Sequence, residues 1–288
     1  SAPEPAATAA IAVADAGQIR SRGVEPSQQR HWDWKAAGNF VCGGIGSGRH
    51  TTSLLVDDDV LIDAGSGLTT LDFEQLLKID HVLLTHAHLD HVLGLPLLLD
   101  SVGDLRGTPV TVHALPEVLE VLATHLFNWQ LWPDFRVIPS AEAPWLRFEP
   151  LGFGEAFTLK GRTFRPLPVN HVVPACGLHV ATHAGSLVFS GDTTHSEAFI
   201  QALNAIPDLR HLIIETSFEN ELVDIAKASK HHWPDSLAAE LRMLSVRPKV
   251  WITHLKPGNE AAIMNELREV APGWGVEALL QGQVIELA

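Results

Sequence analysis

Four potential metal ligands crowd into six positions behind a short apolar run. In the segment HVLLTHAHLDH, residues 81–91, the ligand-type side chains are His86, His88, Asp90 and His91. His86 and His88 are two positions apart and can face one ion in an extended turn, which leaves Asp90 and His91 to face a second centre. Neutral imidazole and carboxylate groups are the usual ligands of zinc and similar divalent ions. Solvated loop histidines are the alternative for any one residue, but the HxHxDH spacing after an apolar strand predicts a metal site.

Further residues of the same kind follow other apolar runs. His171 closes the run TFRPLPVNH, Asp192 follows SLVFSG, and His254 closes KVWITH. Because each side chain stands directly after an apolar run, the three can converge with the first cluster on one edge of a sheet. Asp63 in VLIDAG also stands at a strand end. We expect it to orient a ligand histidine, with a plain turn-forming aspartate as the alternative.

A histidine pair outside this ligand set is suited to proton transfer. His231 and His232 stand in SKHHWPDSL, directly before an expected helix. A hydrolase that expels a basic oxygen gains roughly 10²–10⁴ in rate from a positioned proton donor. Both histidines are candidates for that role. The alternative is an exposed pair beside a helix N-terminus, where the helix dipole disfavours the imidazolium.

Composition limits the classes of protein and partner. The chain has 288 residues, 46% of them hydrophobic and 19% charged, which is enough to bury a large core. Its 20 Lys and Arg stand against 34 Asp and Glu, a formal charge of −14, and no basic stripe occurs. We therefore expect no nucleic acid and no membrane as a main partner. The 16 histidines exceed what structure alone usually needs, the two cysteines make no disulfide framework, and the absence of tyrosine excludes mechanisms that require its hydroxyl.

The elements that must position these residues mix strands and helices. Residues 1–30 are rich in Ala, Pro, Ser and Gln and predict a poorly ordered arm, so we expect the folded domain over residues 31–288. Apolar runs predict strands at Thr52–Val56, Val60–Ile62, His81–Leu84, Val110–Val112, Thr163–Pro166, Leu187–Phe189, Leu212–Ile214 and Lys249–Ile252. Amphipathic stretches predict helices at Pro116–Leu126, Ser196–Ala205, Pro234–Leu244 and Glu260–Val270. This order favours a layered α/β fold in which helices sandwich two sheets.

With its ligand residues in this order, the chain resembles the metallo-β-lactamase superfamily in its two-metal hydrolase form. THAHLDH, then His171, then GDT with Asp192, then His254 carry the likeness, which extends from about Asn39 to the C-terminus. The resemblance implies an αββα sandwich in a single domain and two metal centres bridged by Asp192. The implied ligands are His86, His88 and His171 for one metal, and Asp90, His91 and His254 for the other. Zinc is the first choice because imidazole dominates this set, with manganese or iron as alternatives.

A narrower resemblance follows the first motif. DHVLGLPLLLDSVGDLR, HLFNWQLWPDF, IIETSF, SKHHWP and ITHLKP are similar to segments of the class II cyclic-nucleotide phosphodiesterases, which hydrolyse 3′,5′-cyclic AMP or GMP to nucleoside 5′-monophosphates. The family pattern Lys-His-x-x-Pro selects His231 as the proton donor, so His231 and Asp90 are assigned to catalysis. Phe127, Asn128 and Trp132 are candidates for contact with the base, with core packing as the alternative for the aromatic rings.

The expected reaction is an in-line displacement by a metal-bridging hydroxide. Two cations roughly 3.5–4 Å apart lower the pKa of a shared water and clamp the phosphoryl oxygens. Another hydrolase on the same metals, such as a phosphotriesterase, an arylsulfatase or a thioesterase-like enzyme, would share every ligand and differ only in its pocket. A non-catalytic metal-binding protein would be expected to lose ligands, whereas the full set is present here.

Partner and compartment follow from the same features. The expected partner is a small-molecule substrate, a cyclic nucleotide or another phosphodiester, and a homodimer is left open. A start at Ser1 without a positively charged leader favours the cytoplasm, with the periplasm as the alternative if a signal peptide has been removed.

Overall fold

The first of two large sheets carries strands from both ends of the chain. The computed structural model describes residues 10–13 and 40–287. The strands of this sheet are β1 (Ala10–Val13), β4 (Leu54–Val56), β5 (Val60–Ile62), β6 (His81–Leu83), β7 (Val110–Ala114), β8 (Leu146–Pro150) and β16 (Val284–Glu286). Their order in space is β16-β1-β4-β5-β6-β7-β8. Pairing is parallel from β5 through β8 and antiparallel elsewhere, so strands β5 to β8 end at the same edge.

The second sheet is built from the later part of the chain. Its strands are β9 (Phe157–Leu159), β10 (Arg162–Pro168), β11 (Cys176–Thr182), β12 (Gly185–Phe189), β13 (Leu209–Glu215), β14 (Lys249–Thr253) and β15 (Glu277–Ala278). They lie in the order β15-β14-β13-β12-β11-β10-β9, parallel from β12 to β15 and antiparallel from β9 to β12. A separate two-stranded sheet joins β2 (Phe40–Val41) and β3 (Arg49–His50).

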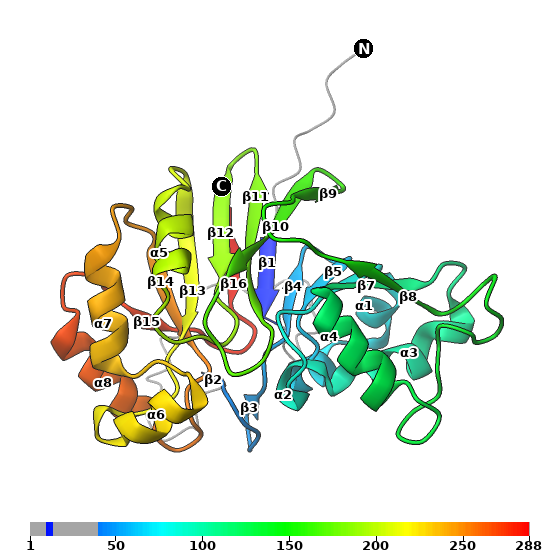
Figure 1. Cartoon of the computed structure of the whole chain (residues 1–288), viewed down its shortest axis with the longest axis horizontal. Helices are drawn as coiled ribbons and strands as arrows, with labels where there is room; N and C mark the ends of the chain where they lie inside the picture. The colour runs from blue at the N-terminus through cyan, green and yellow to red at the C-terminus, as the bar shows by residue number, and fades with distance from the viewer. Residues whose placement is uncertain (1–9, 14–39, 288) are drawn as a thin grey trace, which may run out of the picture.

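Helices cover the outer faces of both sheets. Figure 1 shows one group, which includes α1, α3 and α4, beside the first sheet and a second group, which includes α5, α7 and α8, beside the second sheet. The α-helices are α1 (Phe73–Lys78), α2 (Leu89–Val92), α3 (Gly94–Val102), α4 (Pro116–Val121), α5 (Glu197–Asn204), α6 (Val223–Ser229), α7 (Pro234–Met243) and α8 (Glu260–Val270). The expected αββα sandwich in a single domain is confirmed.

The core lies in two layers because the strands of the second sheet bury both faces. Along β13, Leu212 and Ile214 pack with apolar residues of α5, α7 and α8, whereas Ile213 points the other way and joins the cluster between the sheets. This alternation is the period of two that a strand imposes on its side chains. Strands buried on both faces have continuous apolar sequences, which is why these runs stand out in the sequence.

Local sequence explains where several helices begin. Asp72 accepts a hydrogen bond from the backbone N–H of Gln75 at the start of α1, and Ser196 accepts one from the N–H of Phe199 at the start of α5. Pro234 opens α7 at a position where the missing N–H would be unpaired in any case. The predicted helices over Pro234–Leu244 and Glu260–Val270 match α7 and α8 to within one residue.

Two helical segments differ from the sequence prediction. The predicted helix at Pro116–Leu126 is α4 followed by a π-helical turn at Leu122–Leu126. Helix α3 was not predicted, since Gly94 and Pro96 interrupt its apolar run. Pro96 is tolerated there because it occupies the first turn, where backbone N–H groups have no partner within the helix.

Strand β1 departs from the predicted domain boundary. Residues 10–13, which composition assigns to a poorly ordered arm, form a strand that pairs with β4 on one side and β16 on the other. The sequence AIAV offers backbone groups to two strands that are remote in the chain, and such pairing overrides the composition of the flanking segment. The rest of the predicted arm lies outside the described residues.

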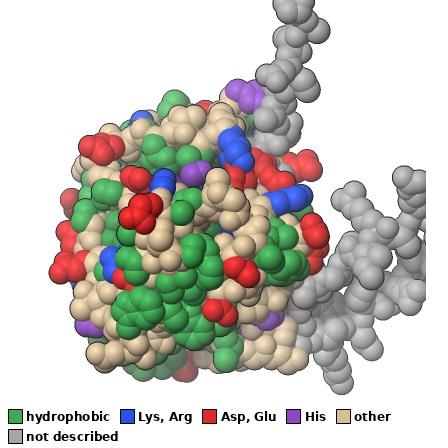
Figure 2. All heavy atoms as spheres, turned by 90° about the vertical axis from the view of Figure 1, so that its right-hand side faces the viewer, with side chains coloured by type: hydrophobic (Ala, Val, Ile, Leu, Met, Phe, Trp, Pro, Cys, Tyr) green, Lys and Arg blue, Asp and Glu red, His purple; other side chains and the backbone are tan. Residues whose placement is uncertain are grey.

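Exposed apolar side chains mark the face that carries α3 and α4. Leu97 and Leu105 stand on and after α3, Trp129 and Leu131 follow the π-helical turn, and all four are between 42% and 63% exposed. Figure 2 looks at this side of the molecule and shows hydrophobic side chains gathered on its surface. Within the described residues no helix is long and apolar enough to cross a membrane.

Candidate metal centre

The chemistry-bearing residues stand at the carboxyl ends of strands from both sheets. Asp63 follows β5, the HxHxDH segment follows β6, and His171, Asp192 and His254 follow β10, β12 and β14. Strands β5 and β6 are parallel, as are β12, β13 and β14, so their ends meet along common edges of the two sheets. Residues from the turns after these strands can therefore converge at one place, as ligand sites of parallel sheets commonly do.

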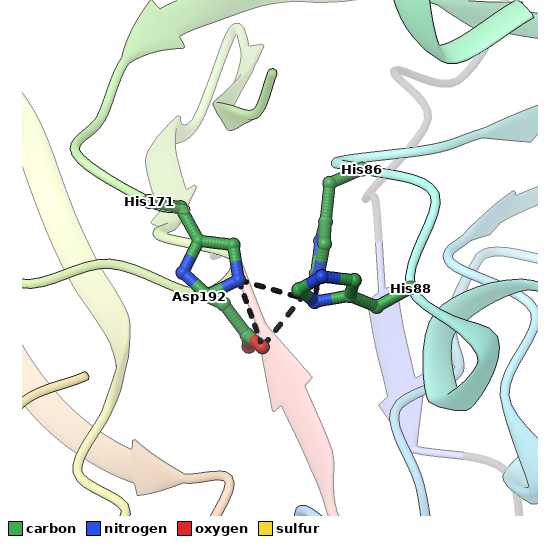
Figure 3. A group of neighbouring side chains, drawn as sticks. All are labelled: His86, His88, His171 and Asp192. Atoms are coloured by element: carbon green, nitrogen blue, oxygen red, sulfur yellow. Dashed lines mark hydrogen bonds and ion pairs between the residues drawn. The ribbon is translucent and has the colours of Figure 1, made fainter. Parts of the chain in front are cut away.

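The first ligand cluster consists of His86, His88, His171 and Asp192, whose ligand atoms all lie within 4.8 Å of one another. His88 Nδ1 is 3.0 Å from His86 Nε2 and 3.2 Å from His171 Nε2. Asp192 Oδ2 is 3.6 Å from His86 Nε2 and 4.0 Å from His171 Nε2. Figure 3 shows the three rings and the carboxylate facing a common point.

The second ligand cluster consists of Asp90, His91, Asp192 and His254. His254 Nε2 is 3.2 Å from Asp90 Oδ2 and 3.3 Å from Asp192 Oδ2. His91 Nε2 is 3.4 Å from Asp192 Oδ1 and 3.6 Å from Asp90 Oδ2. Asp192 thus belongs to both clusters, and a single carboxylate faces two ligand sets at once.

Burial and neighbouring charge set the protonation of these groups. Burial lowers the pKa of His86 well below its ordinary value and that of His171 to about 4, which keeps both rings in the neutral form that binds metal. Burial opposes protonation of His91, but the carboxylates of Asp192 and Asp63 outweigh it and raise the pKa of His91. Burial also opposes ionisation of Asp192, whose pKa is nevertheless held well below its usual range by the histidines around it.

An unpaired buried nitrogen supports metal binding by this set. His91 Nε2 is buried and makes no hydrogen bond, although oxygens of Asp90 and Asp192 lie 3.6 and 3.4 Å away. Buried polar atoms are seldom left without a partner, and a cation held by these three side chains would give this nitrogen one. The nitrogen-rich donor set suits zinc and similar divalent ions. The residues present therefore fit two metal ions.

Asp63 fixes the orientation of His91. Its Oδ2 accepts a hydrogen bond from His91 Nδ1 at 2.7 Å, and its carboxylate also accepts bonds from the Thr85 backbone N–H at 2.8 Å and the Thr85 hydroxyl at 2.9 Å. This turns His91 Nε2 toward the second ligand cluster. Asp63 and His254 both adopt left-handed backbone conformations, with φ of 55° and 60°. Such conformations cost on the order of 1–3 kcal/mol and cluster at functional sites.

Gly43 is a residue of the site that sequence reasoning missed. A Cβ at this position would lie 2.4 Å from His254 Cε1 and 2.6 Å from His254 Nδ1. We expect Gly43→Ala to displace the His254 ring and to weaken binding of one of the two ions by about 10- to 100-fold. Metal titration followed by elemental analysis measures this. Gly46→Ala, where the nearest side-chain atom would be an ordinary 3.4 Å away, is the matched control. Two fully held ions in Gly43→Ala would contradict the prediction.

Glu215, the last residue of β13, holds His231 against the two clusters. Glu215 Oε1 lies 2.7 Å from His231 Nδ1, and Ser217 Oγ bridges Glu215 Oε2 at 3.0 Å and His254 Nδ1 at 2.8 Å. Burial opposes protonation of His231, but Glu215 outweighs it and raises the pKa of His231. The His231 ring centroid is 5.2 Å from that of His171 and 5.0 Å from that of His254, so this ring contacts one histidine of each cluster.

Sequence reasoning did not assign roles to Glu215 and Ser217. Both stand in IIETSF, Glu215 directly after the apolar residues and Ser217 two positions later, so they carry the same strand-end signal that identified the other residues. The alternative of an exposed histidine pair is wrong, because His231 is only 8% exposed and His232 is fully buried. His232 Nδ1 forms a hydrogen bond with Ser236 Oγ at 2.8 Å, its Nε2 lies 3.2 Å from the Glu240 carboxylate, and the residue belongs to neither ligand cluster.

Two adjoining pockets open beside the first ligand cluster. One has a volume of about 290 Å³ and includes His171 and Phe153 in its lining. The other has a volume of about 200 Å³ and includes His88 and Val121. The residues common to both linings are Glu117, Val173 and Pro174. A bound molecule that reaches the first cluster can therefore extend along this shared wall.

The expected base contacts lie elsewhere. Phe127 is completely buried and packs against Phe135, with ring centroids 6.1 Å apart, so direct contact of this ring with a base is wrong. Asn128 Oδ1 instead accepts hydrogen bonds from two backbone N–H groups of the following turn. Trp132 is half-buried against the core. None of Phe127, Asn128 and Trp132 lines either pocket, because core packing uses the rings and the turn uses the amide.

Comparisons with known proteins identify the family of the chain. A family model described as "Beta-lactamase superfamily domain" matches residues 59–255. The chain is 26% identical over 236 residues to a Yersinia pestis protein named "Probable 3',5'-cyclic-nucleotide phosphodiesterase", which covers 72% of this chain and 67% of that protein. It is 35% identical over 134 residues to ribonuclease Z of Bradyrhizobium diazoefficiens, covering 43% of this chain and 41% of that enzyme.

A solved structure has the same fold. Unliganded yeast PDE1 superposes with a TM-score of 0.71 at 17% identity, covering 96% of this chain and 99% of the other. The family model spans more than half of the chain and includes all seven ligand residues, the last of which is His254. The chain therefore belongs to the metallo-β-lactamase superfamily and is a metal-dependent hydrolase of that fold.

Proposed function

We propose that this protein is a two-metal phosphodiesterase that hydrolyses 3′,5′-cyclic nucleotides to nucleoside 5′-monophosphates. The observation that carries the proposal is the shared position of Asp192 in two ligand clusters beside an open pocket. Two cations bound there would neutralise phosphoryl charge and activate a water for in-line attack. The substrate class is supported by the likeness to the Yersinia pestis protein over 72% of the chain.

His231 is the residue that we assign to proton donation. Its Nδ1 is engaged by Glu215, which leaves Nε2 as the nitrogen able to give a proton to the departing 3′-oxygen. Glu215 favours the imidazolium that such a donor requires, and its bond fixes the plane of the ring. Contact of His231 with His171 and His254 keeps the donor next to both ligand clusters. Asp90 takes part through the second cluster as a ligand.

The test is hydrolysis by metal-loaded protein in water enriched in ¹⁸O. We expect cyclic AMP and cyclic GMP to give nucleoside 5′-phosphates that carry one ¹⁸O on phosphorus, because water attacks phosphorus and the P–O3′ bond breaks. Mass spectrometry of the products measures the label. A 3′-phosphate product, or a 5′-phosphate without label, would contradict the proposed mechanism.

A panel of other substrates separates the remaining hydrolases. A phosphotriester, an aryl sulfate and a thioester test the enzymes that would use the same ligands. A precursor tRNA tests the activity named for ribonuclease Z, which the formal charge of −14 disfavours because RNA is a polyanion. Fully metallated protein that hydrolyses one of these but neither cyclic nucleotide would overturn the cyclic-nucleotide assignment and leave the hydrolase assignment intact.

A further inference from the structure

Glu117 is the acidic residue of the wall that the two pockets share. It lines both, and it is the only carboxylate in either lining. Its side chain stands near the start of α4, is exposed, and forms no hydrogen bond or ion pair with another described residue. A carboxylate accepts hydrogen bonds and cannot donate them, so this wall of the pockets can satisfy only donors on a bound molecule.

The surroundings of Glu117 suit a flat ring. Phe153 lines the larger pocket with 52% of its surface exposed, and Val118 and Val121 line the smaller one, while Val173 and Pro174 complete the shared wall. An exposed aromatic ring can stack on a nucleobase, which strengthens binding by about 5- to 150-fold per base. His171 lines the larger pocket and His88 lines the smaller one, and both histidines belong to the first ligand cluster. A nucleotide with its phosphate at the ligand clusters would therefore place its base within this lining.

The two purines differ at the edge that would meet Glu117. Guanine presents two donors side by side, N1–H and the 2-amino group, and one carboxylate can accept both in a bidentate arrangement. Adenine presents its 6-amino donor beside N1, which is an acceptor. The carboxylate has no proton for adenine N1, so one hydrogen bond is absent and two acceptors face each other.

We propose that Glu117 makes the site selective for guanine, so that cyclic GMP is preferred to cyclic AMP. This selectivity rests on the proposed function, since it assigns the base of the substrate that the metal centre would hydrolyse. The shared wall recognises the Watson–Crick edge through Glu117, while Phe153 and the apolar side chains hold the ring without distinguishing one purine from another.

Calorimetry measures the dissociation constants of 5′-GMP, 5′-IMP and 5′-AMP for the metal-loaded protein. Steady-state kinetics give kcat/KM for cyclic GMP, cyclic IMP and cyclic AMP. We expect GMP to bind about 10- to 100-fold more tightly than AMP, since a lost charged hydrogen bond is worth roughly one to two powers of ten. IMP keeps N1–H but lacks the 2-amino group, so it should fall between them. Equal affinity for all three, or a preference for AMP, would overturn the proposal.

Substitution of Glu117 tests its role directly. Glu117→Gln offers both a donor and an acceptor, which matches adenine, so the GMP:AMP ratio should fall by about tenfold or more. Glu120→Gln, an exposed change one turn further along α4, should leave the ratio unaltered. Phe153→Ala should weaken GMP and AMP alike, by about 5- to 150-fold, without changing their ratio. An unchanged ratio in Glu117→Gln would exclude this residue as the selector.

Binding and turnover also separate this proposal from the proposed function. Preferential binding of GMP with no hydrolysis of any cyclic nucleotide would support base selection by Glu117 and overturn the phosphodiesterase assignment. Hydrolysis of cyclic GMP and cyclic AMP at equal kcat/KM, with equal binding of GMP and AMP, would support the phosphodiesterase and overturn the role of Glu117.

Discussion

Asp192→Ala is expected to lose both metal ions together. Its Oδ2 lies 3.3 Å from His254 Nε2 and 3.6 Å from His86 Nε2, so truncation removes a ligand from each cluster in one step. It also leaves the buried imidazoles of both clusters facing one another without the carboxylate between them. We expect elemental analysis after dialysis to show a fall from about two ions per chain to nearly none. Activity should fall by more than about 10³-fold, which exceeds the loss of rate caused by removing a single hydrogen-bond donor from an active site.

Two further variants make this result specific to the shared carboxylate. Asp90→Ala removes a ligand from the second cluster alone, so one ion should remain. Asp100→Ala changes an exposed aspartate of α3 and should keep both ions. If Asp192→Ala retained one full and unaffected ion, the shared role of this carboxylate would be wrong. A thermal melt of each variant shows whether metal loss follows from unfolding.

His231→Ala is expected to lower kcat on a cyclic nucleotide by roughly 10²–10⁴ while metal content stays at its wild-type level. The reason is that the 3′-oxygen is a poor leaving group without a proton. His231 is the histidine next to both clusters, and Glu215 holds it there with Oε1 2.7 Å from His231 Nδ1. The loss should be much smaller on bis(p-nitrophenyl) phosphate, because p-nitrophenolate departs readily without protonation. Steady-state kinetics on the two substrates give this comparison.

The choice of control for His231 follows from burial. His232 is fully buried against Glu240 and Ser236, so its truncation would disturb packing and is unsuitable. His183, exposed in the turn between β11 and β12, is the better control and should leave both activities unchanged on substitution by alanine. Equal losses for His231→Ala on both substrates would indicate phosphate binding in place of proton donation, and loss of an ion would make His231 a ligand.

The ligand residues were accessible from the sequence because each obeys a local rule. His86, His88, Asp90 and His91 occupy a six-residue segment after β6, and the other ligands follow the ends of apolar strands within three residues. Spacing and strand-end position are properties of short segments, so no tertiary information is required to notice them. The same rule, applied to IIETSF, would also have selected Glu215.

Other features depend on contacts between segments that are far apart in the chain. Gly43 matters only because His254 packs against it, more than 200 residues later. Phe127 carries no mark in its sequence that separates a base contact from core packing, and its neighbour Phe135 decides the matter. Strand β11 was missed because Gly177 and His179 break its apolar pattern, yet it pairs with strands on both sides. Tertiary partners override local propensity in these cases.

The division of the ligands between the two sheets has a consequence for how long the folded protein survives. Each ion would have ligands from the segment after β6, in the first sheet, and from the segments after β10, β12 or β14, in the second sheet. It would therefore link the two halves of the sandwich. A ligand that binds only the native state adds about 2.7 kcal/mol to the free energy of unfolding when its free concentration is 100 times the dissociation constant. Metal shortage would therefore loosen the junction between the halves and expose the chain to proteolysis, and the abundance of the protein as well as its turnover would then depend on the supply of the ion.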